Sequence, residues 1–129
     1  MSLAYWCILI AALLPYVWIS IAKASGKHMD NRDPRGWIEK QHEPRVKRAH
    51  AAQLNAFEAL PAFVAGVLMA QLAGVPVATI NLLALVFVVA RVLHGVMYIA
   101  NLDKLRSLAW FVGLGCVLAL MIKAALALG

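Results

Sequence analysis

The sequence predicts an all-α fold, a polytopic integral membrane bundle of four helices. Of its 129 residues, 64% are hydrophobic and 14% are charged, and the mean hydropathy is +0.79. A soluble domain is usually nearer half apolar and a quarter charged. About 20 residues cross a bilayer core, so four spans and their connections nearly exhaust the chain. We therefore expect a single transmembrane domain over residues 1–129 and no separate soluble domain.

Four apolar segments define the expected spans, at about residues 3–22, 48–73, 77–100 and 106–128. The first has aromatic residues towards its ends, as membrane-interface anchors do. It is not preceded by the basic region of a cleaved signal peptide, so we interpret it as a retained span. Pro15 lies inside it, where a proline can kink a membrane helix without ending it.

The connections between the spans have contrasting compositions. Residues 23–47 are polar and are punctuated by glycines and prolines, which predicts a loop, with a short amphipathic helix near residues 36–43. Residues 74–76 predict a tight turn, and residues 101–105 predict a second short connection.

Small residues are available for close helix packing in two spans, and in the second span they recur every four residues. In the second span they are Ala62, Gly66, Ala70 and Gly74. In the fourth span they are Ala109, Gly113 and Gly115.

Positive charge is concentrated directly after the first span. Eight of the twelve Lys and Arg residues lie between Lys23 and Arg48. Cytoplasmic loops of membrane proteins carry such an excess and are attracted to anionic lipid head groups. We expect the two charged connections, 23–47 and 101–105, in the cytoplasm and both termini on the opposite side. The absence of a basic face with interleaved aromatics outside the membrane argues against nucleic-acid binding.

The two cysteines, Cys7 and Cys116, both lie in apolar segments. Their positions fit neither a metal-ligand spacing nor a disulfide framework. We interpret them as small buried hydrophobic residues and expect no metal site.

Polar residues at helical spacing interrupt the second span. Arg48, Asn55 and Glu58 are seven and three residues apart, so they lie along one helical face. Glu58 is roughly 13–15 Å along the helix from Arg48, well inside the hydrocarbon zone. An ionisable group there costs roughly 2.5 kcal/mol or more, so the default interpretation is a functional site inside the bundle.

A matching set lies in the third span and at the start of the fourth. Arg91, His94 and Tyr98 follow the spacing i, i+3, i+7, in the cytoplasmic half of the third span. Arg106 opens the fourth span and is followed by Ser107. A bundle that joins these faces forms a cationic, hydrogen-bonding cleft that opens to the cytoplasm.

The charges of this cleft are unbalanced. Glu58 is the intramembrane acid, and it faces the three arginines Arg48, Arg91 and Arg106. A Glu58–Arg91 ion pair that locks the bundle is the purely structural alternative. It does not account for the surplus of cations, which favours an anionic ligand.

Two stretches carry a resemblance to a known family. RAHAAQLNAFEALP in the second span and RVLHGVMYIANLDKLRS across the third and fourth resemble the membrane-associated proteins in eicosanoid and glutathione metabolism, the MAPEG family. The second stretch is similar to the pattern of microsomal prostaglandin E synthase, and the family also includes microsomal glutathione transferases. One departure is Ala51, where eukaryotic members usually have an arginine; here the arginine is Arg48, about one turn earlier. The loop DNRDPRGW resembles bacterial members, so a bacterial inner membrane is the expected location.

The resemblance implies a homotrimer that binds glutathione, as co-substrate, between neighbouring protomers. By matching position, the tripeptide would be held by Asn55, Glu58, Arg91, His94 and Tyr98, with Glu58 taking its amino group. Arg106 would face the thiol and Ser107 would be a secondary thiol contact. Lys23 is a weaker candidate for a glutathione carboxylate, and Arg48 is a candidate for the contact of the missing family arginine.

This resemblance implies a membrane-bound glutathione-dependent transferase or peroxidase. Its thiolate would attack a hydrophobic electrophile or a lipid hydroperoxide that enters from the bilayer. A small four-helix transporter with an alternating intramembrane carboxylate is one alternative, although an arginine surplus suits organic cations poorly. A family member that binds glutathione without catalysis is another, and it would show binding without turnover.

Overall fold

The computed structural model describes residues 1–27 and 29–129. The helices of this part are α1 (Ser2–Ser25), α2 (Pro34–Glu39), α3 (Pro44–Leu72), α4 (Val77–Ile99) and α5 (Asp103–Leu128). Within it, all but the short α2 are long and apolar enough to cross a membrane. The predicted all-α bundle with four membrane-spanning helices is therefore confirmed.

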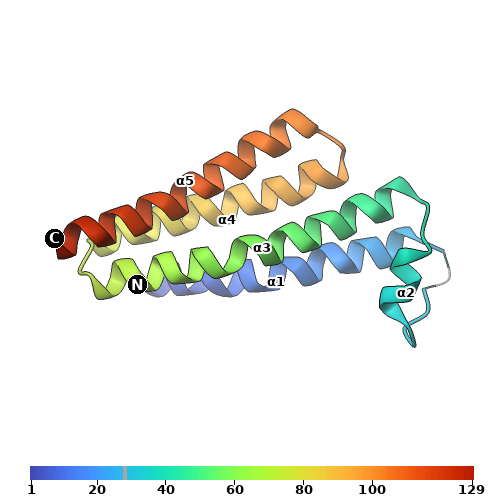
Figure 1. Ribbon diagram of the computed structural model, residues 1–129, viewed down its shortest axis with the longest axis horizontal. Helices are drawn as coiled ribbons and strands as arrows, with labels where there is room; N and C mark the ends of the chain where they lie inside the picture. The colour runs from blue at the N-terminus through green and yellow to red at the C-terminus, as the bar shows by residue number, and fades with distance from the viewer. Residues whose placement is uncertain (28) are drawn as a thin grey trace.

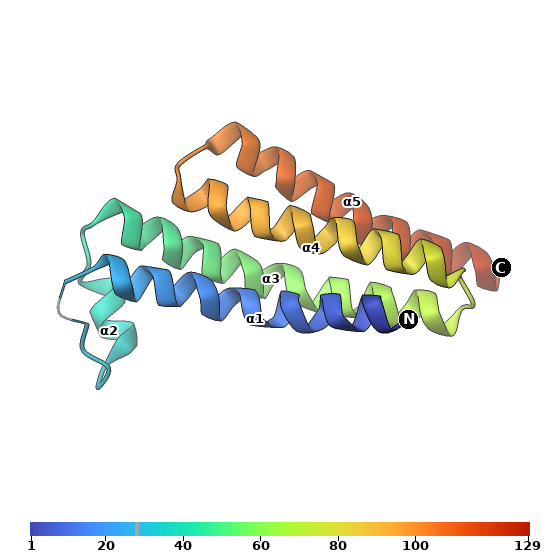
Figure 2. The same ribbon diagram turned by 180° about the vertical axis from the view of Figure 1, so that it is seen from behind.

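The long helices run up and down in alternation (Figures 1 and 2). The helices α3 and α4 are at the centre of the contacts, because each packs against both α1 and α5, whereas α1 and α5 make no contact within the described residues. Both termini and the α3–α4 turn lie at one end, and α2 and the α4–α5 turn lie at the other. This is the arrangement expected for the connections; the side of the membrane remains a prediction.

Prolines, and for α2 a side-chain cap, determine where the helices α2 and α3 begin. Pro34 and Pro44 stand at the first turns of α2 and α3, where a missing N–H costs nothing. The Asp33 carboxylate accepts a hydrogen bond from the Gly36 N–H at 3.2 Å and so caps α2. The short helix thus begins and ends earlier than the expected 36–43, and α3 begins four residues before the expected span. Gly74 has φ +80°, the left-handed conformation that the tight turn requires.

The core lies between the four long helices. Phe63 of α3 and Phe87 of α4 stack at its centre with ring centroids 3.9 Å apart. Both cysteines are buried in it as free thiols, as expected. Gly66 faces α5, where a Cβ would lie 3.3 Å from the Leu120 Cβ, so the small-residue stripe of α3 does allow a close approach.

The small residues of α5 have different surroundings. A Cβ on Gly113 would meet Phe87 and Arg91 at ordinary contact distances. A Cβ on Gly115 would meet no described atom within 4 Å, so the close packing expected there is wrong within one chain. Gly115 is two residues from Gly113, so it lies on a different face of α5, and that face has open space beside it.

Gly95 of α4 packs against a large side chain of α1. A Cβ added there would overlap the indole ring of Trp18, which is 4% exposed on α1. We expect Gly95→Ala to lower the free energy of unfolding by about 1–3 kcal/mol, because the added methyl group would overlap the ring and force it out of its packed position. Thermal unfolding of the purified protein in detergent measures this. Gly115→Ala is the matched control and is expected to keep or slightly raise the Tm; equal Tm values for the two variants would contradict the packing described.

Candidate functional site

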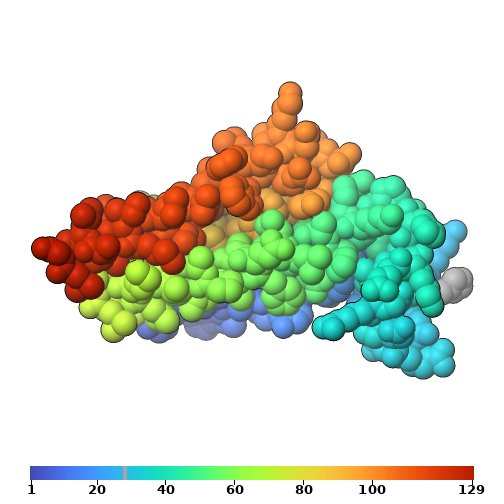
Figure 3. All heavy atoms as spheres, in the orientation of Figure 1, coloured from blue at the N-terminus to red at the C-terminus, as the bar shows by residue number. Residues whose placement is uncertain are grey.

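A polar groove runs between α3, α4 and α5 on the face shown in Figures 1 and 3, where α3 and α5 lie towards the viewer. It consists of two adjoining recesses of about 190 and 250 Å³ that share Asn55 and Trp110. The inner recess is also lined by Glu58, Phe87, Arg91 and Gly113. The outer recess is also lined by His94, Tyr98, Arg106, Ser107 and Phe111.

The inner recess is built around a buried cation. Arg91 is 4% exposed, and its Nη2 donates a hydrogen bond to Asn55 Oδ1 at 2.7 Å. This bond joins α4 to α3 and confirms that the two polar faces predicted from the spacing meet. Burying a guanidinium is costly unless an anion compensates it.

Glu58 lines the same recess but forms no salt bridge with Arg91. Among the described residues, one ion pair forms, between Arg32 and Asp30 in the polar loop. The hydrogen bonds from Arg32 lower the pKa of the Asp30 carboxyl. No Glu58–Arg91 pair forms within 4.0 Å in the described part of the chain, so this structure does not contain the locking ion pair that was the structural alternative to a ligand site. Glu58 is exposed and faces the groove.

The outer recess collects the predicted residues of α4 and the start of α5. The Arg106 Cζ lies 4.5 Å from the centre of the Tyr98 ring, a cation–π geometry. His94 is 3% exposed and meets the Tyr98 ring edge to face, with centroids 5.7 Å apart. Arg106 and Ser107 stand in the first turns of α5, and the positive end of the helix dipole adds to the attraction for an anion.

Two predicted residues lie outside the groove. The Arg48 Nε donates a hydrogen bond to the Ile99 carbonyl oxygen at 3.0 Å, and Arg48 lines a different cavity. The seven-residue spacing correctly placed Arg48 on the same side of α3 as Asn55. Arg48 is two turns nearer the loop end than Asn55, however, and is level with the last carbonyl groups of α4. Lys23 is half-buried in the last turn of α1, which does not contact α5 within the described residues. Roles for both in ligand binding remain predictions.

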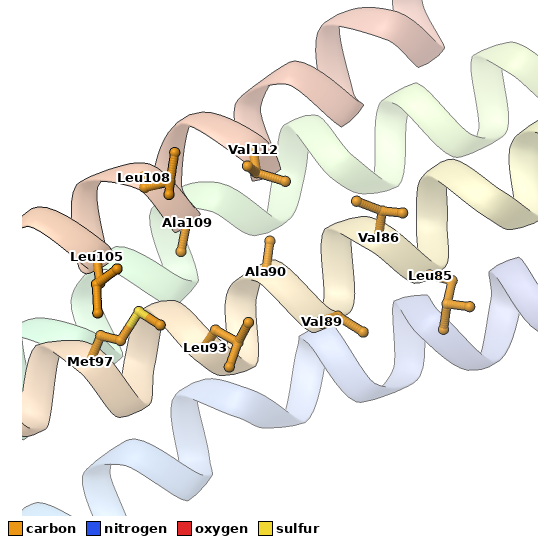
Figure 4. A pocket seen from close by; sticks show the side chains of 10 residues that line it. All are labelled: Leu85, Val86, Val89, Ala90, Leu93, Met97, Leu105, Leu108, Ala109 and Val112. Atoms are coloured by element: carbon orange, nitrogen blue, oxygen red, sulfur yellow. The ribbon is translucent and has the colours of Figure 1, made fainter.

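An apolar pocket of about 360 Å³ lies along the α4–α5 hairpin (Figure 4). Its lining residues are Leu85, Val86, Val89, Ala90, Leu93, Met97, Leu105, Leu108, Ala109 and Val112. Sequence analysis missed this pocket, because apolar residues in a span do not show which of them line a hollow. Its chemistry suits a hydrocarbon group and offers no catalytic side chain.

The fold and the groove together define a four-span helical membrane protein with a cationic intramembrane site. A comparison with known families matches residues 3–126 to the MAPEG family, nearly the whole chain. The chain therefore belongs to the MAPEG family, the membrane-associated proteins of eicosanoid and glutathione metabolism. Comparisons with curated proteins and with solved structures find no match.

Proposed function

We propose that this protein is a membrane-bound glutathione-dependent transferase or peroxidase and that the groove between α3, α4 and α5 binds the tripeptide. The observation that supports this most is the placement of Arg91, Arg106 and Glu58 along one groove. Glutathione has two carboxylates and one ammonium group. Arg91 is complementary to a carboxylate, Glu58 to the ammonium group, and Arg106 to the sulfur once it is ionised.

The proposed roles follow from the contacts. Arg91, already oriented by Asn55, binds a carboxylate in the inner recess, where its charge lacks a partner within 4.0 Å among the described residues. Glu58 accepts hydrogen bonds from the ammonium group. His94 and Tyr98 bind the peptide portion in the outer recess, and Arg106 and Ser107 lie beside the thiol.

Arg106 is proposed as the group that activates the sulfur. An ordinary thiol has a pKa near 8.5, and its thiolate is the nucleophile. A guanidinium held against the sulfur could lower that pKa by about two units, which corresponds to roughly 2.7 kcal/mol. The cation–π contact with Tyr98 limits where the guanidinium can point, so that its charge is in place before the substrate arrives.

Either activity begins from this thiolate. In transfer, the sulfur forms a bond to an electrophilic carbon, and the leaving group departs with the bonding electrons or, in an addition, the electrons pass to the acceptor and are protonated by water. In peroxide reduction, the thiolate attacks the terminal oxygen of the hydroperoxide and the O–O bond breaks, which gives a sulfenic acid and an alkoxide that takes a proton from water and leaves as an alcohol. A second glutathione then reduces the sulfenic acid to give a disulfide and water.

The second substrate is proposed to be a hydrophobic small molecule or lipid. It would arrive from the bilayer, and the apolar pocket of the α4–α5 hairpin offers space for a hydrocarbon chain beside the helix that carries Arg106. The proposed assembly is a homotrimer with glutathione between protomers. In it, Lys23 from a neighbouring protomer is the candidate for an additional carboxylate contact.

Titration of the purified, detergent-solubilised protein with glutathione, followed by thiolate absorbance in the ultraviolet, tests binding and activation together. We expect a saturable thiolate signal at pH 7. S-methylglutathione, which has no ionisable thiol, should compete without producing the signal. No saturable signal and no competition would overturn the proposal, and saturable binding without turnover on a broad electrophile and hydroperoxide panel would overturn its enzymatic part.

A further inference from the structure

A second basic cavity lies away from the groove, at the loop end between α1, α3 and α4. Its volume is about 530 Å³, larger than either recess of the groove. It is lined by Trp18, Ile21, Arg45, Arg48, Val96, Ile99 and Ala100. The helices α1 and α4 that form two of its walls lie towards the viewer in Figure 2.

Two arginines provide the charge of this cavity. Arg45 and Arg48 are three residues apart on α3, so their side chains leave the same helical face. The Nε of Arg48 donates to the Ile99 carbonyl, which fixes the guanidinium at the end of α4, and its Nη groups make no hydrogen bond to any other described residue. Neither arginine has a carboxylate within 4.0 Å in the described part of the chain.

The remaining walls are apolar. Ile21 of α1 and Val96 of α4 line the cavity with Trp18. Val96 is 51% exposed, so this wall continues onto the outer surface of the bundle. The arginines stand level with the last turn of α4, where a membrane-spanning helix ends and lipid head groups begin. The cavity therefore presents positive charge at head-group depth and an apolar surface below it.

We propose that this cavity is a binding site for an anionic phospholipid. The phosphate lies between Arg45 and Arg48, and one acyl chain follows Ile21 and Val96 along the bundle. Guanidinium groups bind phosphate oxygens in a fixed fork, which suits the orientation that Ile99 gives Arg48. Glutathione fits this cavity less well, because no acidic side chain lines it to bind the ammonium group. This proposal assigns Arg48 to a lipid in place of the glutathione contact that the resemblance implied, and it does not rest on the proposed enzymatic function.

Binding of phosphatidylglycerol and phosphatidylcholine to the detergent-solubilised full chain, measured by native mass spectrometry, tests the proposal. Each basic residue near an anionic lipid surface contributes roughly a fivefold gain in affinity. We expect a preference for phosphatidylglycerol that falls about fivefold in Arg45→Gln and further in the double variant with Arg48→Gln. Arg35→Gln removes an exposed cation of α2 and is the matched control, with an unchanged preference.

Comparing Arg45→Gln with Arg48→Gln distinguishes a loss of lipid binding from a loss of stability. Arg48→Gln loses the bond to Ile99 and is expected to be less stable by itself, so each lipid effect is compared with the same variant without lipid. Arg45 makes no such bond, which keeps the test valid if Arg48→Gln does not fold. An equal affinity for both lipids, or an unchanged preference in Arg45→Gln, would overturn the proposal. So would full displacement of the lipid by millimolar inorganic phosphate, or a loss of oligomeric mass in Arg45→Gln, which would identify a free anion or a second copy of the chain as the occupant.

Discussion

Replacing Arg106 with alanine is expected to abolish the thiolate signal of bound glutathione and to lower kcat at pH 7 by roughly 25-fold. The reason is the population of the nucleophile. A thiol of pKa 8.5 is about 3% ionised at pH 7, whereas a thiol of pKa 6.5 is about 76% ionised. The loss should shrink as the pH rises, because free hydroxide then ionises the thiol without help. The measurement is the pH profile of kcat with a soluble electrophile, together with the thiolate absorbance.

Lys104→Ala is the matched control, because Lys104 is an exposed cation two residues earlier in α5 that lines neither recess of the groove. It should leave the pH profile unchanged. Arg106→Lys keeps a charge but loses the planar group over Tyr98, so an intermediate profile is expected. An Arg106→Ala profile that coincides with the wild-type profile would remove Arg106 from the mechanism.

Arg91→Gln is expected to weaken glutathione binding strongly without lowering the stability of the ligand-free protein. Without ligand, the buried guanidinium of Arg91 is held by the Asn55 amide oxygen and by no carboxylate within 4.0 Å among the described residues. Removing this charge also removes the cost of desolvating it, which offsets the lost hydrogen bond to Asn55, so the free energy of unfolding should change little. Glutathione binding should weaken at least 30-fold, because a buried charge pair contributes about 2–5 kcal/mol to binding. Thermal unfolding with and without glutathione measures both effects.

Lys123→Gln serves as the control for losing a cation from a span, since Lys123 is exposed and lies near the other end of α5. It should change neither the stability without ligand nor the shift that glutathione produces. A large loss of stability in ligand-free Arg91→Gln would instead mean that Arg91 holds the bundle together, as a structural ion pair would.

The helical spacing of polar residues predicted most of the groove. Asn55 and Arg91 were placed on two facing helices from spacing alone, and the structure joins them by a hydrogen bond. Spacing succeeds here because a helix fixes the angular position of each side chain and a membrane drives polar faces inward. It did not fix the height of Arg48 relative to α4, which depends on how far one helix is shifted along the other.

Individual contacts between residues far apart in the chain could not be predicted from the sequence. Nothing near Gly95 indicates that the Trp18 ring packs against it, because that pairing arises only when α1 and α4 come together. The hydrogen bond from the Tyr5 hydroxyl to Gln71 Oε1, at 2.6 Å, is of the same kind. The open space beside Gly115 could not be predicted either, because the sequence does not show which residues of a helix lack a neighbour.

The ends of the helices were predicted less well than their existence. The expected second span began at Arg48, where the apolar character begins, whereas α3 begins at Pro44. Hydropathy marks the part of a helix that is in lipid, and the helix continues beyond it because Pro44 favours a first turn. The extra turn of α3 carries Arg45 and so forms part of the second basic cavity.

A structure of the protein soaked with glutathione tests the central proposal most directly. The proposal predicts the tripeptide in the groove between α3, α4 and α5, with its sulfur beside Arg106, a carboxylate on Arg91 and its ammonium group on Glu58. Density for glutathione in the cavity of Arg45 and Arg48, or an empty groove at a saturating concentration, would contradict it.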